Sequence, residues 1–324
     1  MFITRISNGE PGGRGGNVLN TEVKRFKLKR HTADKLFSLM LLLPAIITTT
    51  MFILVPVVDS IYRSFFDYRV RNIISGEPGV WNNFANYIKL FSNGKLVPSM
   101  INTLVFVFGV VIAQFILGMA LALILNTNMK ASRFIRSIMM VPWVVPTIIS
   151  GLVWLWMFQP QYGLVKYIVG VLTGGKVTDF AILNNPATAM FGVSVAALWK
   201  QIPLATLLLL AGLANVPDDM LEAAKIDGAN SVQRFFRITM PYMKSVIKVT
   251  VSMSIIENFK QFPLFWTMTG GGPNNSTTTM AILSYREAFV SNNFGSGAAV
   301  TTVWMLMMIV VVFFYNRIFK ESDV

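Results

Sequence analysis

Polar and charged side chains interrupt two long apolar segments of the 324-residue chain. They are Lys200 and Gln201 in the first segment and Glu257, Asn258, Lys260 and Gln261 in the second. A charge inside a membrane costs on the order of 3 kcal/mol and usually faces a cavity or a partner group. Amide and ammonium groups in such places can bind a polar solute. We interpret Trp199, Lys200, Glu257, Asn258, Lys260 and Gln261 as lining a substrate path.

Glu257 and Lys260 admit a second interpretation. They are three residues apart, so they share one face of a helix and could pair. The pair could be purely structural, or Lys260 could extend outward to the membrane surface. Asn258 and Gln261 add uncharged hydrogen-bonding groups close by, which favours the path.

The residues needed for catalysis are missing from the chain. It has no cysteine and one histidine, which excludes disulfides, thiolate nucleophiles and zinc sites built from cysteine or several histidines. Hydrophobic residues make up 54% of the chain and charged residues 13%, whereas a soluble domain has about 25% charged residues. The composition excludes an ordinary soluble enzyme and a disordered chain, and it indicates a membrane protein. We expect no catalytic residues, no metal and no cofactor.

Six apolar segments are each long enough to cross a membrane. A helix rising about 1.5 Å per residue needs roughly 20 residues to cross a hydrocarbon core of about 30 Å. Lipid offers no partner for a free backbone amide, so we predict an all-α membrane protein whose domain over 36–320 has six transmembrane helices. The expected ranges are 36–58, 101–125, 134–158, 187–213, 246–268 and 298–319. The prolines expected to bend these helices are Pro44, Pro56, Pro142, Pro146 and Pro203.

The basic excess of the chain indicates its orientation. Lys and Arg number 28 against 15 acids, for a formal charge of +13. Eighteen of the 28 lie before the first segment, after the second, after the fourth and after the sixth, and eight lie in the alternate loops. Because Lys and Arg collect on the cytoplasmic side, we expect both termini there and no nucleic-acid partner. Residues 1–35 are predicted to be a flexible, basic cytoplasmic tail that contacts anionic membrane lipid.

The cytoplasmic loop 214–241 is predicted to form a helix, a turn and a second helix. Asp218 follows a proline and opens the first helix with acids in its first turn, where the helix dipole favours them. Gly228 permits the left-handed conformation that ends such a helix. Phe235, Ile238 and Met240 are expected to face the bundle. A short helix with exposed acids beside a glycine hinge favours docking to another protein; the alternative is an ordinary loop on the membrane surface.

This loop resembles the EAA signature of permease subunits of binding-protein-dependent ABC importers. The matching pattern is Glu222-Ala-Ala-x-x-Asp227-Gly-Ala, followed by Phe235-x-x-Ile238-x-x-Pro241. One departure is Ser245, where the family pattern often has a second proline. The resemblance implies that the first helix couples to an ATPase, with Glu222 as the charged contact and Gly228 as the turn. The coupling residues that it implies are Asp218, Glu222, Ala223, Ala224, Asp227, Gly228 and Ala229.

Other segments are similar to the maltose-type sugar branch of this family. They are Asn102-Thr103, Leu117-Gly-x-Ala-Leu-Ala122, Trp199-Lys-x-x-Pro203 and Thr269-Gly-Gly-Gly-Pro273. The resemblance covers about 36–320, and the overall run of the sequence is similar to the larger permease of alginate-oligosaccharide importers. It implies the type I ABC importer permease fold in a bacterial cytoplasmic (inner) membrane, working by alternating access.

The resemblance also implies partners and a class of substrate. The partners would be a second homologous permease, two ATP-binding cassette ATPase subunits and an external solute-binding protein. ATP would be hydrolysed by the ATPase subunits, because the loops of this chain are too short to hold a nucleotide-binding domain. The substrate would be an oligosaccharide or a glycerol phosphate-like polyol. If it is acidic, Lys200 and Lys260 are the candidate counter-charges.

Two alternatives remain open at this stage. An ion-driven secondary carrier would show inverted repeats with ionisable groups in both halves, whereas intramembrane charges occur only in the fourth and fifth segments.

The external loop before the second segment carries Trp81, Phe84, Tyr87, Leu90 and Phe91 at helical spacing. We expect an amphipathic helix at the membrane interface there, or a contact with the solute-binding protein.

Overall fold

The computed structural model describes residues 30–127, 132–175 and 181–319, and the chain divides into two compact units, Met1–Pro56 and Val57–Val324. Residues 1–29 of the predicted tail therefore lie outside the described part. The first unit contains helix α1 (Arg30–Thr49) and the π-helix η1 (Thr50–Leu54). They belong to an apolar helical stretch, Phe37–Arg63, whose most apolar window has no buried residue.

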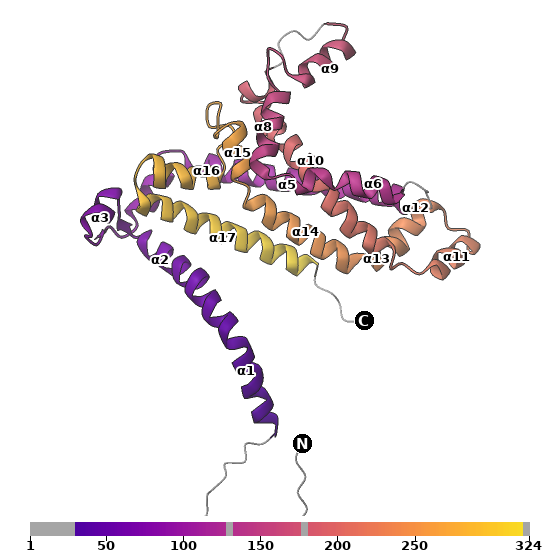
Figure 1. The fold of residues 1–324 in the computed structure, drawn as a ribbon, viewed down its shortest axis with the longest axis horizontal. Coiled ribbons are helices and arrows are strands. Elements are labelled where there is room, and N and C mark those ends of the chain that lie inside the picture. The colour runs from indigo at the N-terminus through magenta and orange to yellow at the C-terminus, as the bar shows by residue number, and fades with distance from the viewer. Residues whose placement is uncertain (1–29, 128–131, 176–180, 320–324) are drawn as a thin grey trace, which may run out of the picture. The chain divides into compact units, whose positions relative to one another are not determined.

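The second unit is almost entirely helical, and Figure 1 shows the course of its elements. Its first part contains α2 (Val55–Arg63, which begins in the first unit), β1 (Phe66–Asp67), α3 (Val70–Ser75), β2 (Val80–Trp81), α4 (Ala85–Ser92) and α5 (Leu96–Leu125). Its middle part contains α6 (Ser132–Met139), α7 (Val141–Val144), α8 (Thr147–Met157), α9 (Leu164–Leu172), η2 (Ile182–Asn184) and α10 (Ala189–Leu213). The next elements are α11 (Asp218–Ile226), α12 (Ser231–Arg234), η3 (Phe235–Thr239) and α13 (Met240–Tyr242). The last part contains α14 (Lys244–Phe259), α15 (Pro263–Met268), α16 (Met280–Tyr285), η4 (Arg286–Val290) and α17 (Phe294–Ile318).

Helices α5, α10, α14 and α17 pack along one another and form the body of the second unit (Figure 1). Small residues allow close approach between α5 and α10: a Cβ added at Gly118 would lie 3.5 Å from the Cβ of Ala205. The elements α11 to α13 lie at one end of this body, and α16 lies at the other (Figure 1).

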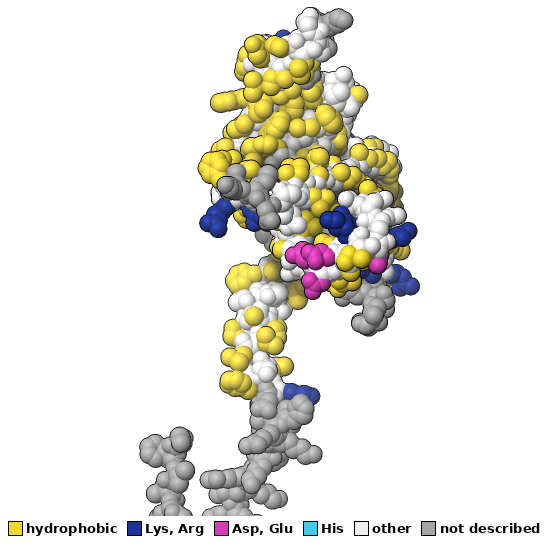
Figure 2. All heavy atoms as spheres, turned by 90° about the vertical axis from the view of Figure 1, so that its right-hand side faces the viewer, with side chains coloured by type: hydrophobic (Ala, Val, Ile, Leu, Met, Phe, Trp, Pro, Cys, Tyr) yellow, Lys and Arg dark blue, Asp and Glu magenta, His cyan; other side chains and the backbone are white. Residues whose placement is uncertain are grey.

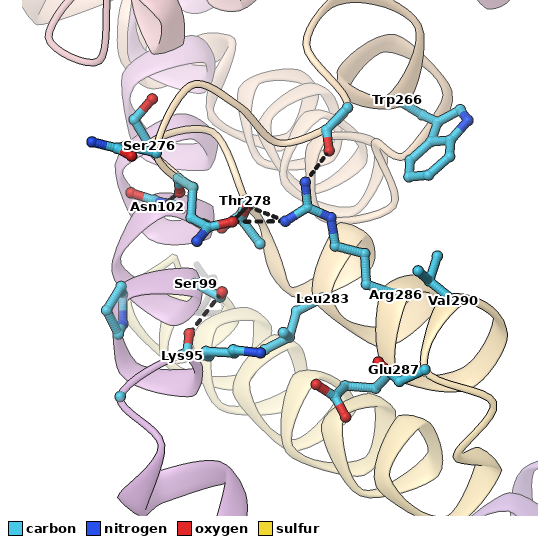
Figure 3. A pocket seen from close by; sticks show the side chains of 16 residues that line it. Lys95, Ser99, Asn102, Trp266, Ser276, Thr278, Leu283, Arg286, Glu287 and Val290 are labelled. Carbon is cyan, nitrogen blue, oxygen red and sulfur yellow. Dashed lines mark hydrogen bonds between the residues drawn. The ribbon is translucent and has the colours of Figure 1, made fainter. Parts of the chain in front are cut away.

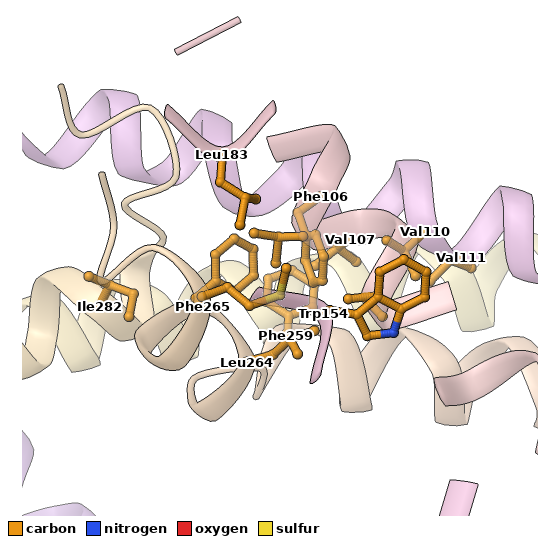
Figure 4. Close-up of a cluster of buried hydrophobic side chains, with 14 of the residues drawn as sticks. Phe106, Val107, Val110, Val111, Trp154, Leu183, Phe259, Leu264, Phe265 and Ile282 are labelled. Carbon is orange, nitrogen blue, oxygen red and sulfur yellow. The ribbon is translucent and has the colours of Figure 1, made fainter. Parts of the chain in front are cut away.

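Buried apolar side chains form a core along these helices. In the cluster drawn in Figure 4, Phe106 of α5 meets Phe265 of α15 edge-on, with ring centroids 4.7 Å apart. A second cluster near the α11 end contains Leu125, Leu213 and Met243. The core therefore joins α15 firmly to α5, although α15 is short.

The predicted third span is not a continuous helix. Its two parts, Ser132–Val144 and Thr147–Met157, meet at an angle of 94°. Val145 is extended, with ψ of 132°, because the residue before a proline avoids the helical region, and Pro146 has no amide to donate. Pro203, by contrast, lies inside the unbroken helix α10. Of these two prolines predicted to bend their helices, Pro146 therefore breaks its helix completely, whereas Pro203 leaves its helix unbroken.

The predicted fifth span is broken as well. Helix α14 ends at Phe259, and α15 begins at Pro263, a residue suited to the first position of a helix. Among the described residues, four helices are long and apolar enough to cross a membrane (Phe37–Arg63, α5, α10 and α17), and the bent pair would add a fifth. The prediction of six continuous spans is thus not confirmed.

The helix predicted in the external loop is shorter than its aromatic spacing indicated. Helix α4 includes Tyr87, Leu90 and Phe91, but Trp81 lies in strand β2 opposite Phe66. Phe84 precedes the helix. The prediction is wrong for Trp81 and Phe84, because rings that share a helical spacing here gather around a short hairpin instead.

Candidate functional site

Helix α11 ends in a hinge built around Gly228. Its first turn contains two acids, beginning with Asp218. Gly228 has a φ of +81°, and its N–H donates to the carbonyl of Lys225 at 3.2 Å. The N–H of Ala229 donates to the carbonyl of Ala224 at 2.9 Å. These two bonds form the Schellman arrangement, which requires a left-handed residue at the glycine position. The helix and hinge predicted from the sequence are confirmed.

The chain after the hinge is anchored on the bundle. Asn230 and Gln233 form a capping box, each accepting a backbone N–H of the other at 2.8 and 2.9 Å. Phe235 and Met240 then pack against the cluster at this end of the bundle, and Ile238 is half-buried. The predicted inward face of the second helix is confirmed, although part of that helix is the π-helix η3.

The outer face of α11 is open to solvent. Glu222 and Ala223 are exposed, and Ile226 is 86% exposed. Figure 2 faces this end of the second unit, where acidic and basic side chains gather around apolar ones. Singly exposed apolar side chains are ordinary on protein surfaces, so what the structure shows is that the outer face of α11 is accessible to a partner. Docking itself stays a prediction for the seven coupling residues.

A cavity of about 520 Å³ lies against α10 and α14, and we call it the α10–α14 cavity. The predicted path residues that line it are Lys200, Gln201, Glu257, Lys260 and Gln261. Asn258 is 2% exposed and lies behind Gln201, while Trp199 meets Trp154 edge-on with ring centroids 6.0 Å apart. The structure thus brings together at one cavity two polar side chains of α10, one of α14 and two from the break between α14 and α15.

Two amides join the helices at the wall of this cavity. Gln201 Nε2 donates to Asn258 Oδ1 and Asn258 Nδ2 donates to Gln201 Oε1, both at 3.0 Å. Asn258 Nδ2 also donates to the carbonyl of Ser254 at 2.9 Å. Because the buried amide is held on both sides, Gln201 is fixed at the cavity surface.

Lys200 donates hydrogen bonds to the backbone at the break in the third span. Its Nζ donates to the carbonyl of Trp143 at 3.2 Å and to the carbonyl of Val145. Both carbonyls lie in the segment before Pro146, where the helix stops and its hydrogen bonding is interrupted. The ammonium therefore supplies donors that the broken helix lacks, while the side chain remains on the cavity wall.

Glu257 and Lys260 form an ion pair across one turn. Lys260 Nζ donates to Glu257 Oε1 at 2.7 Å, and the side chains are 55% and 62% exposed. The pairing predicted from their spacing is confirmed. Since both side chains also line the α10–α14 cavity, the structural and path interpretations apply to the same pair.

Two further polar residues line this cavity and were not selected from the sequence. Gln114 of α5 and Thr250 of α14 are buried, yet Gln114 Oε1 and Thr250 Oγ1 have no hydrogen-bond partner among the described residues. A buried polar atom normally has a partner, so the unpaired atoms of Gln114 and Thr250 are exceptions beside the cavity wall. A single glutamine in the apolar run 101–125 was the available signal for Gln114.

A second cavity, of about 620 Å³, lies between the start of α5 and the loop that follows α15 (Figure 3), and we call it the loop cavity. Arg286 holds the loop in place: its guanidinium donates to Asn275 Oδ1 at 2.7 Å and to the carbonyl of Gly270 at 2.6 Å. Asn102 of α5 donates to the carbonyls of Asn275 and Thr278 at 3.2 and 3.1 Å. The loop is therefore tied to both neighbouring helices.

Replacing Arg286 with alanine is expected to loosen this loop. Loss of a charged donor from its acceptors, of which the Gly270 carbonyl is part-buried, costs about 1–3 kcal/mol. We expect amide hydrogen exchange of residues 270–278 to rise about tenfold, with exchange in α5 unchanged. Arg71→Ala is the matched control, because Arg71 is exposed and makes only a 3.9 Å contact with Asp67. Unchanged exchange in the Arg286 variant would contradict this role.

A family model described as "Binding-protein-dependent transport system inner membrane component" matches residues 114–322. The chain belongs to this family. A trehalose/maltose transport system permease protein (MalF) of Thermococcus litoralis is 36% identical over 76% of this chain and 81% of its own length. A sulfoquinovosyl glycerol transport system permease protein (SmoG) of Agrobacterium fabrum is 32% identical over 81% of this chain and 84% of its own. The relatives are themselves permease proteins, and family membership does not favour the ion-driven carrier.

A solved structure shows the same fold. The crystal structure of a bacterial ABC transporter involved in the import of alginate contains a chain that matches with a TM-score of 0.74. It covers 90% of this chain and 97% of that one at 20% identity. The chain thus has the type I permease fold of this neighbour, and the α10–α14 cavity and the α11 hinge are parts of it.

Proposed function

We propose that this chain is a permease subunit of an ATP-driven sugar importer of the bacterial cytoplasmic membrane. It crosses the membrane six times with both termini in the cytoplasm, and the two broken helices complete the third and fifth crossings. Its partners are a second permease, two ATPase subunits and an external solute-binding protein. Relatives named for maltose, sulfoquinovosyl glycerol and sn-glycerol 3-phosphate support a sugar or polyol substrate.

The observation that carries this proposal is the arrangement of two features along one bundle. The bare face of α11 lies at one end, and the α10–α14 cavity, with unpaired hydrogen-bonding groups, lies along the helices that α11 to α13 join. ATP-driven movement of the ATPases would pull on α11 and change the exposure of the cavity. Alternation of this kind needs different contact energies in the two states, which ATP and the loaded binding protein supply.

Uptake by the reconstituted complex tests the proposal. The permease pair, the ATPases and the binding protein are placed in proteoliposomes, and radiolabelled maltose, trehalose, sn-glycerol 3-phosphate and alginate oligosaccharides are offered with and without ATP. We expect uptake of at least one of these sugars or polyols, dependent on ATP and on the binding protein. Uptake without the ATPases would overturn the proposal and restore the ion-driven carrier.

Lys260→Ala is expected to separate acidic from neutral substrates. Removing the ammonium leaves Glu257 unpaired at the cavity wall, so an acidic sugar would meet a repulsive charge. We expect uptake of an alginate trisaccharide to fall about tenfold, equivalent to about 1.4 kcal/mol, and uptake of maltotriose to change less than twofold. Lys244→Ala, an exposed lysine at the start of the same helix, is the control. Equal effects on both sugars would exclude a charge role.

A further inference from the structure

The wall of the loop cavity combines an aromatic side chain with hydrogen-bonding groups. Trp266 lines it and is 40% exposed, and Asn102, Ser276 and Arg286 line it too (Figure 3). Ser276 Oγ is buried and has no hydrogen-bond partner among the described residues. A volume of about 620 Å³ falls in the range of about 300–1,000 Å³ typical of small-molecule sites. The cavity therefore has the size and the polar groups of a binding site.

Trp266 belongs to a continuous row of rings that we call the aromatic ladder. Its members are Phe262, Trp266, Tyr285, Phe289 and Phe294. Successive ring centroids are 5.7, 4.7, 5.1 and 5.5 Å apart, within the contact range of aromatic pairs. Phe262 and Trp266 are stacked, with an angle of 19° between their planes. The ladder thus joins α15 to the segment that contains α16 and η4.

The ladder runs between the two cavities. Pro263, next to Phe262, lines the α10–α14 cavity, whereas Trp266 lines the loop cavity. Three residues along a helix rise about 4.5 Å, so the two cavities are lined by residues about one turn apart on α15. Val290, next to Phe289, also lines the loop cavity. A chain molecule with several rings could therefore contact both cavities at once.

We propose that the loop cavity is a second sugar-binding subsite, in which one pyranose ring of an oligosaccharide stacks on Trp266. The proposal rests on the proposed function, since it assumes that the solute is a sugar. A pyranose presents C–H groups on its faces and hydroxyls around its edge. The electron-rich face of an indole attracts the C–H groups. The hydroxyls would lie against Asn102, Ser276 and Arg286, the polar side chains on the cavity wall.

The subsite predicts a dependence on chain length. A short sugar occupies the α10–α14 cavity alone, whereas a longer chain leaves its trailing rings in the loop cavity. The aromatic ladder could instead contact the second permease subunit. We favour the sugar because the cavity that Trp266 lines also has polar side chains on its wall, and one of them, Ser276, has a buried Oγ without a hydrogen-bond partner among the described residues. The experiment below distinguishes contact with the second permease subunit from binding of a sugar.

Trp266→Leu in the reconstituted complex tests the subsite. Uptake of maltose is compared with maltopentaose, and an alginate disaccharide with the alginate pentasaccharide. In the sugar series that the complex transports, we expect uptake of the five-ring chain to fall about fivefold and uptake of the short sugar to stay within twofold. Trp266→Phe, which keeps an aromatic face, is expected to retain uptake of the long chain. Trp156→Leu is the control, because Trp156 is 67% exposed and lines neither cavity.

Each other outcome has a distinct meaning. If the Trp266→Leu variant takes up both the long and the short sugars as fast as the wild type does, the subsite is overturned and the proposed function stays intact. A wild-type complex that transports only the short sugars would do the same. Dissociation of the variant complex on size exclusion would assign the ladder to the subunit interface and overturn the subsite. A wild-type complex that takes up no sugar would overturn the proposed function, and the subsite with it.

Discussion

Replacing Glu222 with arginine is expected to abolish coupled transport, with at least a tenfold loss of both sugar uptake and substrate-stimulated ATP hydrolysis. Glu222 is exposed on the bare face of α11, so the substitution leaves the folded chain intact. If Glu222 meets a basic group of the ATPase, the arginine places two like charges together at the interface, at a cost on the order of 3 kcal/mol. The measurement is uptake and phosphate release by the same proteoliposomes, with and without the binding protein.

A second variant and a control separate docking from folding. Lys244→Glu reverses an exposed charge at the start of α14, outside α11, and is expected to change neither activity. Gly228→Val places a β-branched residue at a φ of +81°, where left-handed backbone costs about 1–2 kcal/mol. No atom lies within 4 Å of an added Cβ at this position, so we expect backbone strain in the hinge and no clash at Cβ. Full coupling in the Glu222→Arg variant would mean that α11 is not the contact with the ATPases.

The features that the sequence predicted best are those set by local chemistry. The hinge follows from Gly228 after an acid-rich start, and the Glu257–Lys260 ion pair follows from a spacing of three residues. The long helices α5, α10 and α17 follow from apolar length alone. In each case the residues that decide the structure are neighbours along the chain.

The features that the sequence did not predict depend on contacts between distant segments. Gln201 and Asn258 were both selected, but their mutual hydrogen bonds depend on how α10 and α14 are aligned. That alignment is set by the packing of many apolar side chains, which have no one-to-one pairing rule. From the sequence, Arg286 was assigned only as one of the charges in the external loops. Its contacts could not be predicted, because they depend on the fold of the loop around Gly270.

The helix breaks show that the length of an apolar run does not by itself predict a continuous helix. The run 246–268 is apolar enough to suggest one span, yet it stops at Phe259 and resumes at Pro263. A proline can bend, break or remain within a helix, as Pro146 and Pro203 show. The outcome depends on whether a neighbour satisfies the freed carbonyls, and at Pro146 that neighbour is Lys200 of another helix.

Asn258→Leu is expected to lower sugar uptake at least tenfold and also to destabilise the fold. The substitution leaves the amide of Gln201 without its buried partner, and such a pair between membrane helices contributes about 0.6–1.7 kcal/mol. Gln201 then no longer has a fixed position on the wall of the α10–α14 cavity. The measurements are uptake by the complex and the thermal unfolding midpoint of the purified permease.

The double substitution Gln201→Leu with Asn258→Leu separates these two effects. Replacing both partners of a buried hydrogen bond with apolar groups is nearly neutral for stability, so the unfolding midpoint is expected to recover. Uptake is expected to stay low, because the cavity has lost a polar wall. Thr206→Val, which removes a buried hydroxyl of α10 outside the cavity, is the control and should retain uptake. If uptake recovers together with stability, the pair is only structural, and the α10–α14 cavity does not bind the sugar through Gln201.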